Sequence, residues 1–310
     1  MQSIKNIFPD VVRIEASGLC NFKCVHCPTG TEPNMRPFLD EHKFSIIMDQ
    51  FIANNFIPRV VVLYHGGEPL LNKHLGQYIG LLKKIGVAKT VITTNSSLLS
   101  MERAEQLILA GLDELKVSFD GENAEENNSI RKNGDFYRNA YNVKNLCGVR
   151  RKLGGKNPTI IIHNTRICNK STLKTLSQSR RFVFQEAPRY ITDYFKDECN
   201  EIEFRSIPAM VWPGFQLFGN LEEVSFPSSS PQYCGALFET FTILSDGYVV
   251  PCCYDLKGEV KLGNIFEINM FDIWNNSEYM EMREDFKRHK YRQFCSRCRV
   301  VHPRYLCKSV

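Results

Sequence analysis

The chain has 310 residues, of which 43% are hydrophobic and 24% are charged, and its net charge is +5 at pH 7. These values are ordinary for a globular protein with a sizeable core, and the length allows one α/β barrel or a barrel-like domain with a small second domain. No run of 18 apolar residues is present, which excludes a membrane-spanning helix. A secretion signal and nucleic-acid-binding signatures are absent too. We therefore expect a cytoplasmic protein with neither a membrane nor a nucleic acid as partner.

Strands and helices are predicted to alternate over the first two hundred residues. Apolar residues recur at helical spacing in one segment, at Phe44, Ile47, Met48 and Phe51. The nearly continuous apolar run 59–65 is typical of a buried parallel strand. Together these patterns predict strands at 11–17, 59–65, 89–94, 114–119, 158–165 and 201–207, and helices at 38–55, 74–86, 101–111, 136–155 and 170–182. The alternation indicates an α/β fold, either an open doubly wound sheet or, as we expect, a partial (β/α)6 TIM-like barrel. In a barrel the chemistry sits at the C-terminal ends of the strands.

The C-terminal third has a different composition. A segment rich in proline, serine and aromatic residues begins near residue 208, and its large rings either pack between domains or line a substrate pocket, namely Trp212, Phe215 and Phe218. Two alternating runs turned at Asp246–Gly247 predict a β-hairpin over 239–253, and residues 270–289 predict one final helix. We therefore expect two domains, a barrel over 1–225 and a small β-hairpin plus helix domain over 226–310.

The twelve cysteines are unusual for a chain expected in a reducing compartment, where clustered cysteines indicate metal ligands or catalytic thiols. The first set directly follows the first predicted strand, at Cys20, Cys24 and Cys27. The second set lies near the other end of the chain, at Cys234, Cys252, Cys295 and Cys298. From the residues alone, either set is compatible with zinc, which favours four thiolate or imidazole ligands, or with an iron–sulfur cluster. In a cluster, the first set leaves one iron without a protein thiolate.

The first set, Cys-x3-Cys-x2-Cys after the first strand, resembles the signature of radical S-adenosylmethionine (radical SAM) enzymes. The resemblance implies a [4Fe–4S] cluster on Cys20, Cys24 and Cys27, whose fourth iron is chelated by SAM, and a 5′-deoxyadenosyl radical that takes a hydrogen atom from substrate. It also implies an electron donor of flavodoxin or ferredoxin type. The segment Gly66-Gly67-Glu68-Pro69 resembles the family motif that holds the methionine ammonium of SAM. Further cofactor contacts implied by the resemblance are His26, Asn95, Ser118, Asp120 and Arg131.

The second set, with the hairpin between its members, resembles the auxiliary-cluster domains called SPASM and Twitch. Only Cys307 follows Cys298, so the full SPASM ligand set is not complete. The resemblance therefore implies one auxiliary [4Fe–4S] cluster on the second set, as in Twitch enzymes. The spacing is most similar to that of Twitch dehydrogenases that oxidise an aminocyclitol of the 2-deoxy-scyllo-inosamine type.

Three reactions follow from these expectations. The first is oxidation of a hydroxyl-bearing small molecule of sugar or aminocyclitol type, with the auxiliary cluster as electron acceptor and Glu203 or Arg205 as candidate base. The second is epimerisation, with a thiol such as Cys253 as hydrogen-atom donor. The third is peptide modification, which we expect less because Cys20 leaves no room before it for a leader-binding domain. A zinc-stabilised binding scaffold is the non-enzymatic alternative.

Overall fold

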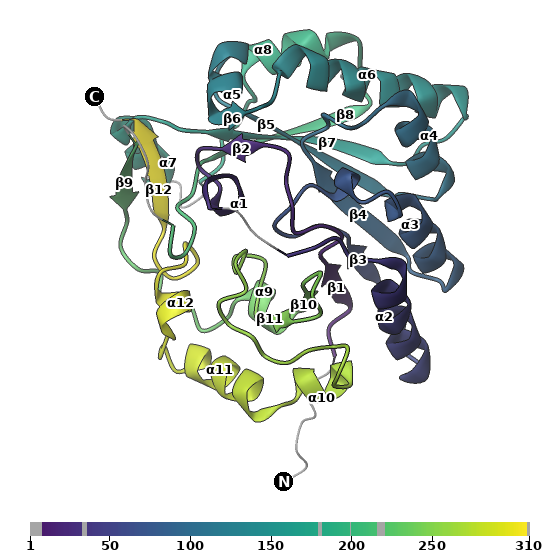
Figure 1. Cartoon of the computed structure of the whole chain (residues 1–310). Helices are drawn as coiled ribbons and strands as arrows, with labels where there is room; N and C mark the ends of the chain where they lie inside the picture. Colours follow the sequence, from purple (N-terminus) through teal and green to yellow (C-terminus); the bar gives the residue numbers. More distant parts are fainter. Residues whose placement is uncertain (1–7, 33–35, 179–181, 199, 216–220, 309–310) are drawn as a thin grey trace.

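The computed structural model of the chain describes residues 8–32, 36–178, 182–198, 200–215 and 221–308, so Phe218 lies outside the described residues. Its main feature is a curved eight-stranded sheet with strand order β11–β10–β1–β3–β4–β5–β7–β8 (Figure 1). No helix within these ranges is long and apolar enough to cross a membrane. The mixed α/β fold with a parallel sheet is the predicted one.

Six strands of the sheet are parallel and follow each other in the chain: β1 (Val11–Ile14), β3 (Val60–Val62), β4 (Lys89–Thr94), β5 (Glu114–Asp120), β7 (Thr159–Arg166) and β8 (Ile202–Pro208). They are the six strands that the sequence predicted. The predicted hairpin is also present, as β10 (Thr240–Ile243) and β11 (Val249–Val250). β10 lies parallel to β1, so the hairpin extends the barrel sheet. The domain boundary near residue 225 stays a prediction, since the sheet itself is continuous across it.

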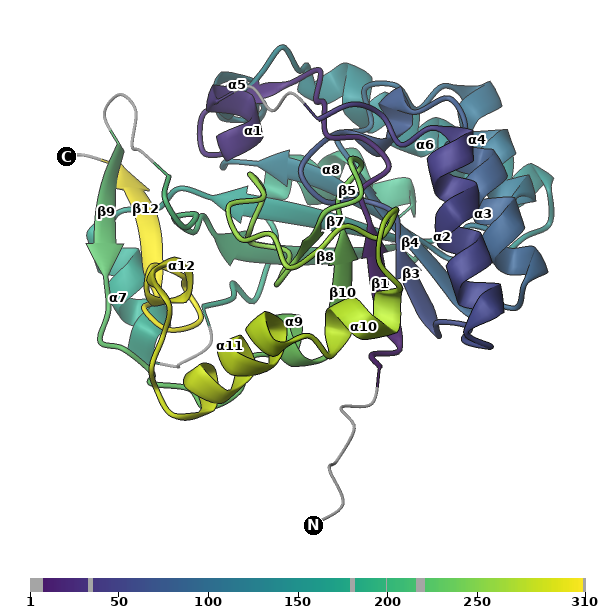
Figure 2. The same ribbon diagram turned by 60° about the horizontal axis from the view of Figure 1, so that its bottom comes forward.

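Helices of the βα units cover one face of the sheet (Figures 1 and 2): α2 (Glu41–Ala53), α3 (Leu75–Lys84), α4 (Met101–Leu109) and α6 (Phe136–Lys152). Because strand side chains alternate, β5 shows the division clearly. Leu115, Val117 and Phe119 are buried in the core under the helices. Lys116 and Ser118 point to the other, inner face and stay partly accessible.

The prediction of one final helix over 270–289 is wrong. The structure has two helices there, α10 (Met270–Trp274) and α11 (Ser277–Lys287). Asn276 lies between them, where its side chain accepts a hydrogen bond from the backbone N–H of Tyr279 at 2.8 Å and donates one to the carbonyl of Leu262 at 2.6 Å. Asparagine is a favoured N-cap because its side chain replaces a missing helical acceptor. The rings of Trp274 and Phe241 meet in the core, which holds α10 next to β10.

Several elements were not predicted. Two short ribbons flank the main sheet, one formed by β2 (Lys23–Cys24) and β6 (Arg131–Lys132), the other by β9 (Leu221–Ser225) and β12 (Arg304–Lys308). The remaining helices are mostly short: α1 (Pro28–Thr31), η1 (Pro69–Leu71), α5 (Ala124–Ile130), α7 (Lys170–Gln178), α8 (Arg189–Tyr194), η2 (Lys196–Glu198), α9 (Gly235–Phe238) and α12 (Gln293–Ser296). Of these, α7 alone matches a predicted helix, over 170–182.

Candidate active site

The first three cysteines gather in the loop that follows β1. Cys24 lies in β2 directly opposite Arg131 of β6, and its thiol interacts electrostatically with those of Cys20 and Cys27. Burial raises the pKa of Cys20 to about 11 and that of Cys24 to about 12. The thiolate is the metal-binding form, so these thiols ionise at neutral pH only when a metal displaces their protons.

The Gly66–Pro69 loop packs tightly against this cysteine loop. A Cβ atom on Gly67 would lie 2.3 Å from the carbonyl oxygen of Ser17 and 2.4 Å from that of Leu19, so only glycine fits there. The buried carboxylate of Glu68 accepts hydrogen bonds from Thr94 Oγ1 at 2.7 Å, Asn95 N at 2.8 Å and Leu70 N at 3.1 Å. A carboxylate has about four acceptor sites. One therefore remains for a donor such as an ammonium group.

A second polar group lies where β5 ends. Arg131 Nη1 donates to Asp120 Oδ2 at 2.9 Å, and His26 Nε2 lies 3.8 Å from the same oxygen. Each of the three side chains also has a buried polar atom without a hydrogen-bond partner in the described parts of the chain: His26 Nδ1, Asp120 Oδ1 and Arg131 Nε. Burial lowers the pKa of His26, which keeps the ring neutral at pH 7. Orphaned polar atoms beside three thiols fit a polar cofactor at this position.

The other predicted site residues are engaged within the protein or lie in strands of the main sheet. Asn95 uses its side-chain amide within the protein, because Nδ2 donates to Asn21 in the cysteine loop at 2.9 Å. Ser118 faces the inner side of the sheet. Glu203 and Arg205 share one face of β8, as their spacing predicted, and form an ion pair of 2.7 Å that is about half exposed at the edge of the sheet. Their catalytic roles stay predictions.

The second cysteine set surrounds one small pocket in the C-terminal part. Cys234, Cys252, Cys295 and Cys298 all line it, together with Leu237, Pro251, Tyr254, Met282, Phe286, Phe294, Val300 and Val301. The sulfur atoms come from the N-terminus of α9, the segment after β11, and α12 with the turn that follows it. Four thiols facing an apolar enclosure fit a buried iron–sulfur cluster, in which each iron binds one thiolate. Cys253 does not line this pocket.

A single metal ion makes a different demand from a cluster. Its ligands have to converge on one point, and no group of three His, Cys, Asp or Glu side chains does so within the described ranges. A cubane distributes its ligands over four irons instead.

Comparison with known families decides the class of protein. The sequence model described as the radical SAM superfamily matches residues 14–169, about half of the chain. The chain belongs to the radical SAM superfamily. The model of the iron-sulfur cluster-binding SPASM domain matches residues 234–299. This radical SAM protein therefore uses SAM and [4Fe–4S] clusters, which the two cysteine sets and the orphaned polar atoms beside the first set fit.

Curated relatives resemble part of this radical SAM protein. The AdoMet-dependent heme synthase of Methanosarcina barkeri is 32% identical over 126 residues, which is 40% of this chain and 34% of the relative. The probable GTP 3′,8-cyclase of Sulfolobus acidocaldarius is 36% identical over 107 residues, 34% of this chain and 33% of the relative. The matches thus span about a third of each relative's length.

Solved structures share the fold over most of the chain. BtrN in complex with AdoMet and 2-DOIA has a TM-score of 0.58 at 18% identity and covers 95% of this chain and 94% of its own. Native anSMEcpe with bound AdoMet has a TM-score of 0.63 at 17% identity, covering 93% and 90%. Streptococcus suis SuiB has a TM-score of 0.58 at 18% identity, covering 89% and 68%. At these identities the likeness shows the fold alone.

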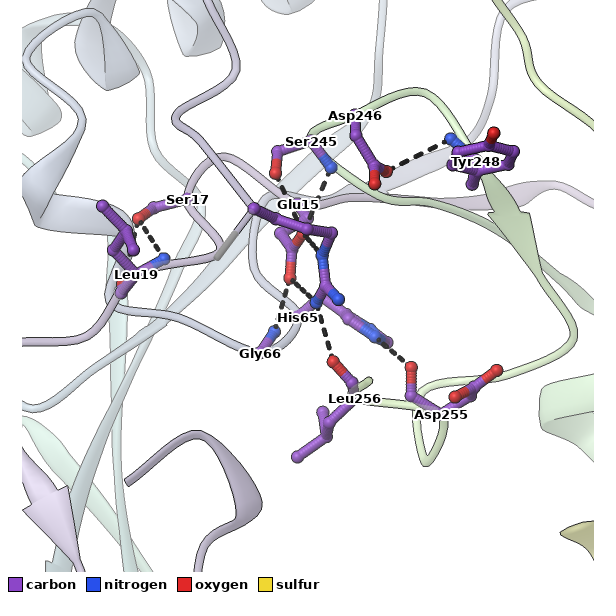
Figure 3. Close-up of polar contacts among 11 residues, drawn as sticks. Glu15, Ser17, Leu19, His65, Gly66, Ser245, Asp246, Tyr248, Asp255 and Leu256 are labelled. Carbon is purple, nitrogen blue, oxygen red and sulfur yellow. Dashed lines mark hydrogen bonds and ion pairs between the residues drawn. The ribbon is translucent and has the colours of Figure 1, made fainter. Parts of the chain in front are cut away.

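A buried polar network that the sequence did not reveal links Glu15 and the Gly66 loop to the segments after β10 and β11 (Figure 3). The carboxylate of Glu15 is fully buried. It binds Arg36 in a bidentate pair at 2.7 and 2.8 Å, and it accepts from the backbone N–H of Gly66 at 3.2 Å and of Ser245 at 3.1 Å. Arg36 also donates to the carbonyl of Leu256 at 2.7 Å. One ion pair thus ties β1, the loop after β3, and the segments after β10 and β11 together.

Breaking this pair should destabilise the protein strongly. We expect Arg36→Met to lower the free energy of unfolding by about 3–5 kcal/mol, because it leaves the Glu15 carboxylate buried without a counter-ion. Arg59→Met is the matched control, since Arg59 lies 3.9 Å from Asp10 with both side chains about two-thirds exposed, and such pairs contribute about 0–1 kcal/mol. Urea unfolding of the two variants checks this. Equal losses in both would contradict the assigned role of the Glu15–Arg36 pair.

The same network should make the protein sensitive to acid. Burial lowers the pKa of His65 to about 4, and the neutral ring hydrogen-bonds the carbonyl of Asp255 at 2.9 Å. The unfolded chain binds this proton near pH 6.5, so the stability that His65 contributes is complete above pH 6.5 and is lost as the pH falls towards 4. We expect His65 to make the free energy of unfolding about 2.5 kcal/mol lower at pH 4.5 than at pH 7. His65→Gln should lack this part of the pH dependence, because glutamine does not titrate. Comparing unfolding midpoints of the two chains at pH 7 and 4.5 measures it.

Proposed function

We propose that the protein is a radical SAM oxidoreductase that oxidises a hydroxyl-bearing small molecule of sugar or aminocyclitol type. The observation that carries the proposal is the second thiol pocket. Its ligand Cys252 follows β11, and β11 joins the barrel sheet through β10 and β1. The proposed cluster ligands are Cys20, Cys24 and Cys27 for the SAM-binding cluster, and Cys234, Cys252, Cys295 and Cys298 for the auxiliary cluster.

The auxiliary site has a clear use in an oxidation. Cys20, Cys24 and Cys27 would hold the cluster to which SAM binds, and SAM would there supply the radical for removing a hydrogen atom from the carbon bearing the hydroxyl group. Conversion to a ketone then requires loss of the hydroxyl proton to a base and of one electron to an acceptor. The Glu203 carboxylate beside Arg205 is our candidate base, and a cluster held by Cys234, Cys252, Cys295 and Cys298 would accept the electron. The similarity in fold to BtrN, whose title names bound 2-DOIA, supports this substrate class. A flavodoxin or ferredoxin type donor would reduce the first cluster.

Epimerisation is the second candidate, favoured by one observation. Cys253 is half-buried and stays outside the auxiliary pocket, although its neighbour Cys252 lines it. A thiol free of a cluster is able to return a hydrogen atom to a substrate radical, which inverts the carbon. The thiyl radical left on sulfur then needs one electron from the external donor and one proton to become a thiol again.

Product analysis in D2O separates the two functions. The reduced enzyme is incubated with SAM and a panel of cyclitols, aminocyclitols and sugars, and 5′-deoxyadenosine is counted against product. We expect a product lighter by two hydrogens in both the wild type and Cys253→Ala. A product of unchanged formula with one deuterium, lost in Cys253→Ala, would replace dehydrogenation by epimerisation. Turnover only with peptides would overturn both assignments.

A further inference from the structure

The inner face of the barrel sheet, opposite the helices, carries a band of polar side chains. Strand register places Arg13 of β1 level with Val62 of β3, and Thr93 of β4 level with Lys116 of β5. His163 lies on the same face of β7, one step further along. These polar side chains are all partly accessible, whereas the alternate residues are buried under the helices. The inner face therefore presents polar side chains towards the inside of the barrel.

The acidic side chains of this face are already paired. Glu114 contacts Lys116 at 3.1 Å and Lys89 at 2.5 Å, and Glu203 at the edge of the sheet is bonded to Arg205. The next acid on the same face, directly after β1, is Glu15, which forms an ion pair with Arg36. The inner face thus offers no free carboxylate to a further cation in the described part of the chain.

Arg13 differs from Lys116 and Arg205 on this face, because both of those cations are paired with a carboxylate. It has no ion pair with a carboxylate within the described residues. Its Nη1 donates to the carbonyl of Tyr64 at 3.1 Å, and its guanidinium carbon lies 4.9 Å from the centre of the Tyr64 ring. Its Nε is buried and has no hydrogen-bond partner there. A guanidinium presents donors in a fork that fits two oxygens of one anion. The thiols of Cys253 and Cys252 are the other electrostatic neighbours of Arg13, and neither offers such a pair of oxygens.

The pKa values of two neighbouring side chains, Tyr64 and His163, reflect the positive charges on this face. Burial raises the pKa of Tyr64, but the charges of Arg13 and Lys116, together with side-chain hydrogen bonds to Thr93 and Arg13, outweigh burial, and the pKa is lowered overall. Burial, together with the charges of Lys116 and Arg205, lowers the pKa of His163 to about 4. His163 is thus neutral at pH 7 and adds a polar contact without a charge, and its buried Nε2 has no partner among the described residues.

We propose that Arg13 binds a carboxylate group of the substrate on the inner face of the barrel. The inference deepens the proposed function, because it adds an anionic group to the expected substrate. It rests on the proposed function in one respect, which is that the substrate is a small molecule. The site lies beside the SAM loop without belonging to it. Arg13 precedes Glu15 by two residues, about 7 Å of strand, and Glu15 contacts Gly66 of that loop. Lys116 strengthens the field from the next row, and Tyr64 orients the guanidinium through its carbonyl and ring.

The test uses a simple carboxylate and does not need turnover. The holoenzyme with both clusters and saturating SAM is titrated with acetate at constant ionic strength, and thermal unfolding reports binding. We expect acetate to raise the unfolding temperature of the wild type, and acetamide to have no effect. Arg13→Gln should weaken the apparent acetate affinity by about tenfold or more, which corresponds to loss of one charged bidentate contact. Arg59→Gln, an exposed arginine, should behave as the wild type.

Three outcomes would overturn the proposal: no acetate effect in the wild type, an equal effect in Arg13→Gln, or an equal effect of acetamide. A titration with inorganic phosphate in place of acetate tests which anion the site prefers. If phosphate raises the unfolding temperature more than acetate does, the proposed ligand is a phosphate group and not a carboxylate. If Arg13→Gln fails to retain iron, Arg13→Lys and Lys116→Gln serve instead, and both should weaken acetate binding by a smaller factor. The acetate titration measures binding and does not depend on product formation. A negative titration therefore does not contradict the dehydrogenase proposal, and a negative product analysis does not contradict binding of a carboxylate by Arg13.

Discussion

Replacing Cys24 by alanine is expected to abolish 5′-deoxyadenosine release and to halve the iron content, from about eight to about four atoms per chain, since each [4Fe–4S] cluster holds four irons. Cys24 is the central thiol of the first set and lies in the β2–β6 ribbon opposite Arg131. Without it the cluster keeps two of its three protein thiolates, and the site where SAM binds is lost. Reconstituted protein, iron analysis and quantification of 5′-deoxyadenosine measure the effect.

Cys147→Ala is the matched control for that result. Cys147 lies in α6, is fully buried in the core and belongs to neither cysteine set, so its loss costs packing without removing a cluster ligand. The control should keep about eight irons and continue to cleave SAM. If Cys24→Ala retained SAM cleavage at the rate of Cys147→Ala, the first set would not hold the SAM-binding cluster.

The second large effect concerns the auxiliary pocket. Cys252→Ala should also retain only about four irons, but its remaining cluster should still cleave SAM. Product formation should fall by about a hundredfold or more, because the substrate radical has lost its electron acceptor. An increase of about 2.7 kcal/mol in the activation free energy corresponds to a factor of that size. The ratio of 5′-deoxyadenosine to product would rise accordingly, and mass spectrometry of the two products gives this ratio.

The neighbouring residue provides a close control for Cys252. Cys253 adjoins it in sequence but does not line the pocket, so Cys253→Ala should retain about eight irons. Loss of the second cluster in both variants would show that the pocket as described is not the binding site. Loss of product with full iron in Cys253→Ala would instead support the epimerase.

Much of this architecture could be predicted because its signals are local. The period of apolar residues located all six parallel strands of the barrel, and the turn at Asp246–Gly247 located the hairpin. Both cysteine sets stood out because tight spacing is visible in the sequence itself. The broken final helix was missed, since Asn275–Asn276 interrupts an apolar pattern that continues on both sides of it, and an asparagine pair inside a periodic segment was the only signal.

The polar network was beyond the reach of sequence patterns. Glu15 and Arg36 are 21 positions apart, and their backbone partner Leu256 lies 220 positions beyond Arg36. A charged residue in a predicted strand, such as Arg13 or Glu15, is ordinarily taken to face solvent. Only the strand register shows that these two side chains point into the barrel, and only the pairing of the surrounding acids shows that Arg13 is left without one.

The parallel pairing of β10 with β1 has a consequence for how the chain folds. β1 is made first, but one of its two neighbours in the sheet lies about 230 residues later. Until β10 emerges from the ribosome, the apolar strand Val11–Ile14 has an open edge that invites pairing with other chains. Contacts across such separations form slowly, so we expect nascent chains that stop before residue 240 to depend on chaperones and to aggregate when released.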